Sequence, residues 1–275
     1  MNWRLWRAQI AAILRLELRK TLLGKRAIAV YVLAASAVLL FGMHSIAAGR
    51  GWIRCRADED FLLYAGFFQL FYLRLAIFFG CVFVFMNLFR GEVLEKTLHH
   101  YLLAPVRREV LAAGKFLSGL LASVLLFGAG TALSFLIVCS HVAQIRHQEF
   151  MAEPLPAHLA AYLGVTVLAC LGYGSVFLVM GLLFRNPMIP AVGVLIWESI
   201  TVFVPPLLKK ISVIFWLESL CPVQVPFGGA GKIFAISGEP ASPWLAVPGL
   251  LALTAVLVLL AALRLRRLEI NYGAE

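Results

Sequence analysis

Long apolar runs separated by short polar segments dominate this chain. A helix that crosses the hydrocarbon layer of a bilayer needs about 20 predominantly apolar residues, and six runs have roughly this length. They cover residues 27–48, 67–89, 111–140, 158–184, 188–204 and 244–263. A core-facing helix of a soluble protein would instead repeat its apolar residues every three or four positions. The pattern therefore predicts an all-α polytopic membrane protein with six transmembrane helices.

The first 26 residues differ from the apolar runs because they are both basic and amphipathic. Trp and aliphatic side chains share one face of a helix, whereas Arg15, Arg19 and Lys20 contribute to its positive charge. This combination is typical of a helix that lies in the membrane interface. A cleaved signal peptide is the alternative, but the apolar run that follows is too long for one. We therefore expect an interfacial connecting helix over residues 1–26.

Three polar segments complete the predicted organisation. A connector over residues 90–110 follows the second span, and a tail over residues 264–275 follows the sixth. The stretch 207–243 is partly apolar and partly rich in Gly and Pro. Its apolar part is too short to cross a bilayer, so we expect a partly re-entrant segment before the last span.

Composition and charge support this organisation and add a sidedness. The chain has 275 residues, of which 62% are hydrophobic and 14% charged, with a net charge of +10. Basic residues accumulate on the cytoplasmic side of membrane proteins. With both termini inside, sixteen Lys and Arg residues fall in inner segments and seven in outer ones. The distribution predicts cytoplasmic termini and a cytoplasmic connector, and it accounts for the positive charge without a nucleic-acid partner.

The connector carries the most informative pattern. Between Val93 and Leu103 its apolar residues recur at steps of three and four, and Pro105 then ends the predicted helix. A short amphipathic helix at the cytoplasmic surface must bury its apolar stripe against lipid headgroups or against a partner protein. The spacing alone leaves both alternatives open.

The stretch from Phe89 to Lys115 resembles the first cytoplasmic loop of type-2 ABC exporter permeases. The matching pieces are Arg90-Gly91-Glu92, Thr97-Leu98, Leu102-Leu103, Pro105-Val106, Arg108-Glu109 and Gly114-Lys115. The family's Gly before Thr97 is Lys96 here, and the pair His99-His100 is unusual. The resemblance implies a coupling helix that docks into a separate ATPase subunit. It assigns that role to Glu92, Thr97, Leu98, Leu102, Leu103, Pro105 and Arg108.

An ATP-binding loop is not expected on this chain. Such a loop needs the pattern G-x-x-x-x-G-K-[ST], and neither Gly114-Lys115 nor Gly231-Lys232 fits it. The resemblance therefore implies an ABC ATPase partner that carries ATP and Mg, and no cofactor or metal on this chain. It also implies a second permease copy or homologue as dimer partner, a location in the cell inner membrane, and export as the function.

Two charged residues lie inside apolar runs. Burial of a carboxylate at the bilayer centre costs on the order of 3 kcal/mol, so Glu198 should face protein or water. Arg74 lies in the second run, about 7 Å from the level of Glu198 at 1.5 Å per residue. The hypothesis is that the two form an intramembrane pair or that Glu198 lines the translocation path. The alternative is a protonated Glu198 that hydrogen-bonds between helices.

A second class of function rests on histidines. His44 and His141 both lie near the outer ends of predicted spans, where paired imidazoles can ligate haem. Met43 and Cys139 nearby would also suit a soft metal such as copper. The alternative function is thus a membrane anchor that binds haem or quinone for a redox complex. Cys55 and Cys221 also fall in predicted outer segments, where either a disulfide or two thiols are compatible with the sequence.

Overall fold

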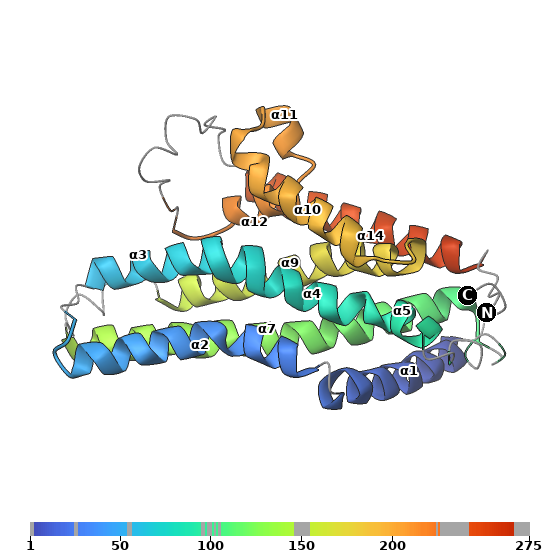
Figure 1. The fold of residues 1–275 in the computed structure, drawn as a ribbon, viewed down its shortest axis with the longest axis horizontal. Coiled ribbons are helices and arrows are strands. Elements are labelled where there is room, and N and C mark those ends of the chain that lie inside the picture. Colours follow the sequence, from blue (N-terminus) through green and yellow to red (C-terminus); the bar gives the residue numbers. More distant parts are fainter. Residues whose placement is uncertain are drawn as a thin grey trace.

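The computed structural model of this chain is a long bundle of helices (Figure 1). It describes residues 3–24, 27–53, 57–94, 97, 101, 103, 106–145, 155–223, 225 and 242–266. No strand occurs among these residues. The predicted all-α class is therefore confirmed.

Five helices in the described part are long and apolar enough to cross a membrane. They are α2 (Ala27–Gly49), the continuous run of α3 (Ala57–Phe67), η1 (Phe68–Ile77) and α4 (Phe78–Phe85), then α7 (Arg108–Ile145), α9 (Leu155–Leu183) and α14 (Pro243–Arg266). Each is at least 23 residues long, which corresponds to about 35 Å at 1.5 Å per residue. The polytopic membrane character follows from these lengths.

The two ends of the bundle differ in the elements that meet there. At the near end, α1 (Trp3–Leu23) and α5 (Asn87–Leu94) lie beside the first residues of α7 and the last residues of α14 (Figure 1). Arg108 at the start of α7 donates to the carbonyls of Leu265 and Arg266 at the end of α14. At the far end, the end of α2 meets the start of α3 and the end of α7. We use the names near end and far end below.

The fifth predicted span, 188–204, is not confirmed as a membrane-crossing helix, so the structure does not confirm the count of six. Here α10 (Met188–Ile200) has 13 residues and gives way to the short 3₁₀ helix η2 (Thr201–Phe203). A crossing helix needs about 20 residues. However, both α9 and α14 end at the near end, so the chain must run back toward the far end between them (Figure 1). The helix α10 is the longest described element of that return.

Part of the predicted re-entrant segment 207–243 lies inside the bundle. After α11 (Pro206–Lys209), the short helix α12 (Val213–Ser219) packs against α9 and α14. Its residues Val213, Ile214 and Leu217 are buried. Cys221 follows, also buried, with its thiol donating to the carbonyl of Leu217 at 3.6 Å. The suggested partner Cys55 lies outside the described residues.

The N-terminal helix packs on protein along one face. Ile13 of α1 is buried against α7 at Gly114, where an added Cβ would lie 3.1 Å from the Ile13 side chain. Arg15 and Arg19 are exposed on another face of the helix. In Figure 1, α1 runs in about the direction of α2 rather than across the bundle. The apolar stripe predicted to lie on lipid thus contacts α7, and contact of the basic face with lipid stays a prediction.

The second span contains ten residues of π-helix, η1. A π-helix shifts the helix register and often occurs at functional sites. Here the Tyr72 hydroxyl lies 3.2 Å from the carbonyl oxygens of Ala34 and Phe127 and shares its proton between them. Gly130 makes this approach possible, because an added Cβ would lie 2.4 Å from the Ala34 oxygen. The segment also directs Arg74 into the bundle.

Candidate functional site

A fully buried lysine organises the near end of the bundle. Lys115 of α7 is 0% exposed. Its Nζ donates to Oε1 of Glu17 at 2.6 Å and to the carbonyl of Leu88 at 2.9 Å. The same Nζ lies 2.8 Å from Oε1 of Glu92. Because a buried ammonium needs both counter-charge and hydrogen-bond acceptors, this environment explains how the charge is accommodated.

An aromatic residue of the connector closes the site. The Tyr101 hydroxyl donates to Oε1 of Glu17 at 3.2 Å. The ammonium of Lys115 lies 4.7 Å from the ring centroid of Tyr101 and 5.4 Å from that of Phe89. These distances are in the range of a cation–π contact. We call Glu17, Glu92, Tyr101 and Lys115 the near-end cluster; it joins α1, α5, the connector and α7.

The near-end cluster contains two carboxyl groups for one ammonium. Burial raises the pKa of Glu92 to about 7; Lys115 opposes the rise and Glu17 adds to it. Neither Glu92 oxygen has a hydrogen bond of acceptable geometry, although Oε1 is close to Nζ. Burial therefore favours the uncharged form of Glu92, the second acid beside a single ammonium group.

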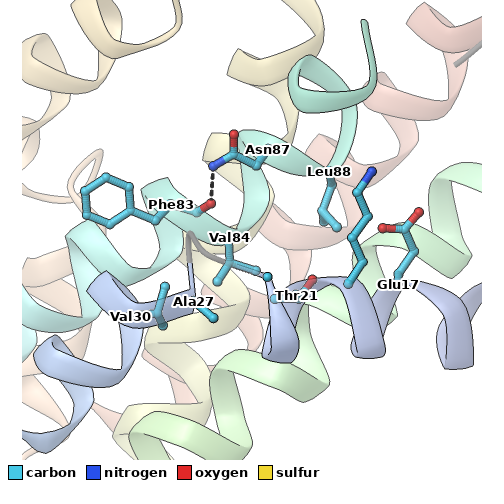
Figure 2. Close-up of a pocket in the computed structure, with 10 residues that line it drawn as sticks. Glu17, Thr21, Ala27, Val30, Phe83, Val84, Asn87 and Leu88 are labelled. Atoms are coloured by element: carbon cyan, nitrogen blue, oxygen red, sulfur yellow. Dashed lines mark hydrogen bonds between the residues drawn. The ribbon is translucent and has the colours of Figure 1, made fainter. Parts of the chain in front are cut away.

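A pocket of about 240 Å³ opens beside the near-end cluster, where α1 passes into α2 (Figure 2). Glu17 and Thr21 of α1 line it, with Ala27 and Val30 of α2 on the apolar side. Figure 2 shows the Asn87 amide donating to the carbonyl of Phe83, at 2.6 Å. The lining thus combines the charged side chains of Glu17 and Lys20 with apolar side chains such as Val30 and Phe83.

The residues predicted to couple to an ATPase differ in how exposed their side chains are. Glu92 is 1% exposed, so its side chain faces the interior of the bundle, and its part in the coupling loop stays a prediction. Leu103, in contrast, is 81% exposed. The backbone N–H of Thr97 donates to the carbonyl of Glu92 at 2.9 Å and continues the turn after α5. Leu98, Leu102 and Pro105 lie outside the described residues.

Arg108 also has a role inside the chain. Its guanidinium donates to the carbonyls of Leu265 at 3.0 Å and Arg266 at 2.6 Å, which are the last carbonyls of α14. Glu109 pairs with the Arg266 side chain. A cation at a helix C-terminus satisfies carbonyls that have no partner within the helix. The Arg108-Glu109 pair thus ties the start of α7 to the end of α14.

The basic residues of α1 differ in their surroundings. Arg15 and Arg19 are exposed. Lys20 has a side chain that is 44% exposed, and its Nζ lies 3.8 Å from Oε1 of Glu92. One predicted interfacial residue therefore contacts the near-end cluster from outside.

Arg74, one of the two charged residues in the apolar runs, pairs with a glutamate that the sequence did not point to. Arg74 binds Glu218 of α12, with its Nε 2.9 Å and its NH2 nitrogen 2.7 Å from Oε1. Its NH1 group reaches Glu198 only at the backbone carbonyl, at 3.3 Å. The predicted side-chain pair of Arg74 with Glu198 is therefore replaced by a pair with Glu218. The two residues are 144 positions apart, so no helical spacing could reveal them.

The Glu198 carboxyl group caps α12. Its oxygens accept from the hydroxyl of Ser212 at 2.5 Å and from the N–H groups of Val213 and Ile214, both at 3.0 Å. A carboxylate at the first N–H groups of a helix satisfies donors that would otherwise be buried without partners. Glu198 thus fixes α10 to α12, while a role in the translocation path stays a prediction.

The two far-end histidines lie together around a third residue. His44 of α2 and His141 of α7 have ring centroids 6.1 Å apart. Asp60 of α3 lies between their Nε2 atoms, 3.1 Å from that of His44 and 3.9 Å from that of His141. We call these residues the far-end cluster. Since the carboxylate stands between the nitrogens, where a porphyrin would have to lie, the alternative of haem ligation does not fit.

Comparison with known proteins identifies a family. The sequence pattern that describes ABC-2 family transporter proteins matches residues 13–203, from the middle of α1 to the end of η2. This range contains the whole near-end cluster and the whole far-end cluster. No curated protein sequence matches the chain.

Proposed function

Because the chain belongs to the ABC-2 family of transporter proteins and is a membrane permease subunit of an ABC-type transporter, we propose that it couples ATP hydrolysis on a partner to export. The near end faces the cytoplasm in this proposal, which agrees with the excess of Lys and Arg there. Both termini are then cytoplasmic, and the membrane is the cell inner membrane. A second permease copy or homologue completes the transporter.

The near-end cluster is the observation that carries the proposal. ABC-2 permeases normally work with an ABC ATPase. A movement that this ATPase imposes on the connector reaches Tyr101 and Glu92 first. Both contact the same buried Lys115 of α7, and breaking a buried ion pair costs about 3–5 kcal/mol. The connector, α1 and α7 therefore move as one body, and this motion converts the permease between inward- and outward-facing states.

Leu103 is the described residue that best fits the contact with the ATPase. Its side chain is 81% exposed at the near end and only a few residues from Tyr101. Burial of a leucine side chain stabilises a complex by about 1.5–3 kcal/mol. The predicted contacts Leu98, Leu102 and Pro105 flank it in the sequence. ATP and Mg bind to the partner in this proposal.

The substitution Leu103→Asp tests the proposal. We expect it to weaken binding of the ATPase that co-purifies with the wild-type chain by about 10–100-fold, with a matching loss of vanadate-sensitive turnover. The measurement is pull-down and ATPase activity in reconstituted membranes. The matched control is Leu16→Asp, an equal change at a leucine that is 54% exposed on α1. Equal activity of the two variants, or a wild-type chain that recruits no ATPase, would contradict the coupling proposal.

A further inference from the structure

The far-end cluster brings together three metal-ligating side chains from three helices. The Nε2 atom of His44, a carboxylate oxygen of Asp60 and a ring nitrogen of His141 all lie within 4.8 Å of one another. Asp60 and His141 are each 5% exposed, and the His44 side chain is 18% exposed. Asp60 and His141 are thus shielded from solvent, and solvent contacts the site mainly at the His44 side chain.

Two of these groups have an unused polar atom that is buried. Oδ2 of Asp60 and Nε2 of His141 have no hydrogen-bond partner. They lie 3.9 Å apart, which is too far for a hydrogen bond between them. Buried polar atoms in folded proteins almost always have a partner. The geometry therefore indicates a bound species that contacts both atoms at once.

We propose that the far-end cluster binds a divalent first-row transition metal ion, with Zn²⁺ as the clearest candidate. Two imidazoles and one carboxylate are a ligand set that such ions prefer over Mg²⁺ or Ca²⁺, which favour oxygen ligands alone. Ligand atoms about 2.0–2.1 Å from a tetrahedral ion are roughly 3.4 Å from one another. In the structure Nε2 of His44 lies 3.1 Å from Oδ1 of Asp60, and Nε2 of His141 lies 3.9 Å from Oδ2. One donor atom from each of the three residues lies within 4.8 Å of the other two, so small side-chain shifts would bring them to this spacing. Three protein ligands leave one position for water.

The proposed ion would fasten the far end of the bundle. His44 is five residues before the end of α2, and Asp60 is in the first turn of α3. His141 is in the last turns of α7. One ion would hold the α2–α3 connection against α7, at the end opposite to the near-end cluster. The site is independent of the ATPase partner, so its test does not depend on the proposed function.

Direct metal binding tests the inference. The full chain in detergent, without a polyhistidine tag and stripped with a chelator, is titrated with Zn²⁺ and, in parallel, with Co²⁺. We expect one Zn²⁺ per chain and a Co²⁺ absorption spectrum typical of mixed nitrogen and oxygen ligation. His141→Gln and Asp60→Asn should each weaken binding by about 100-fold or more, since even outer-shell partners of a metal contribute 10–100-fold.

A matched histidine distinguishes this site from adventitious binding. His158 lies at the far end, in the first turn of α9, and is not part of the far-end cluster. His158→Gln should therefore bind Zn²⁺ as the wild type does. Elution profile and melting temperature of each variant establish that it is folded. Absence of saturable binding by the folded wild type would overturn the inference, and so would equal binding by wild type, His141→Gln and Asp60→Asn.

Discussion

The two ends of the bundle both bury ionisable side chains, but they satisfy them differently. At the near end the ammonium of Lys115 fills the space between Glu17 and Glu92 and touches both. At the far end Asp60 and His141 are equally buried, yet each keeps an atom without a hydrogen bond. The near-end cluster therefore includes a cation from α7, whereas the described contacts of the far-end cluster leave Oδ2 of Asp60 and Nε2 of His141 without hydrogen bonds. Buried charge of this kind is stable only when the counter-charge is present.

Removing the internal cation should produce the largest effect. Lys115→Met leaves Glu17 and Glu92 buried without counter-charge, and we expect a loss of about 3–5 kcal/mol in the free energy of unfolding. Unfolding in mixed micelles of mild detergent and dodecyl sulfate measures it. Lys20→Met removes a charge that is 44% exposed and 3.8 Å from Glu92, so it should cost less than about 1 kcal/mol. A Lys115→Met protein as stable as Lys20→Met would show that the cluster does not need its cation.

The second carboxyl group of the near-end cluster should make the free energy of unfolding depend on pH. We expect this effect to be the second largest. Burial raises the pKa of Glu92 from its ordinary 4.5 to about 7. Between these values the folded chain binds more protons than the unfolded chain, so stability falls as pH rises and levels off above about 7. The total change is at most about 3 kcal/mol.

Unfolding measured from pH 4 to pH 8 checks this dependence, and Glu92→Gln should flatten it. The control Glu59→Gln changes an exposed glutamate of α3 and should leave the slope as it is. If the free energy of unfolding of Glu92→Gln still falls with pH as in the wild type, a group other than Glu92 binds the proton.

The smallest effect is expected at the far end in the absence of metal. Asp60→Asn then loses little more than the hydrogen bond to His44 at 3.1 Å, which is worth about 1 kcal/mol. Melting curves of chelator-treated wild type and variant test this, with His158→Gln as reference. A loss as large as that of Lys115→Met would mean that the far-end cluster is already complete as an ion pair and needs no metal.

Much of the fold was readable because membrane spans depend on local properties. The runs 27–48 and 111–140 lie within the helices α2 and α7, and the run 158–184 follows α9 to within one residue of its end. The run 188–204 differs, because Pro205 and Pro206 and the 3₁₀ turn before them stop α10 after 13 residues. Apolar composition indicates that a segment avoids water. It does not indicate whether the segment forms one continuous helix long enough to cross a bilayer.

The sites were far less accessible to sequence reasoning. Glu92 and Arg108 were predicted as residues of the coupling loop, and the structure shows that both have partners inside the chain. Glu17, Asp60 and Glu218 were not singled out as site residues, since a charge in a polar segment or an amphipathic helix is usually solvated. The expectation that these charges are solvated failed because the partner of each one comes from a distant segment of the chain. Lys115 and Glu17, for instance, are 98 residues apart.

The sequence by itself determined that this chain is helical and spans a membrane several times, because apolar burial is additive along a continuous run. It also determined the basic character of the near end. Only the tertiary structure decided which charges meet. Lys115 fits between two acids, and His44 and His141 converge on Asp60, because the packing of α1, α2, α3 and α7 sets these distances to within a few tenths of an ångström.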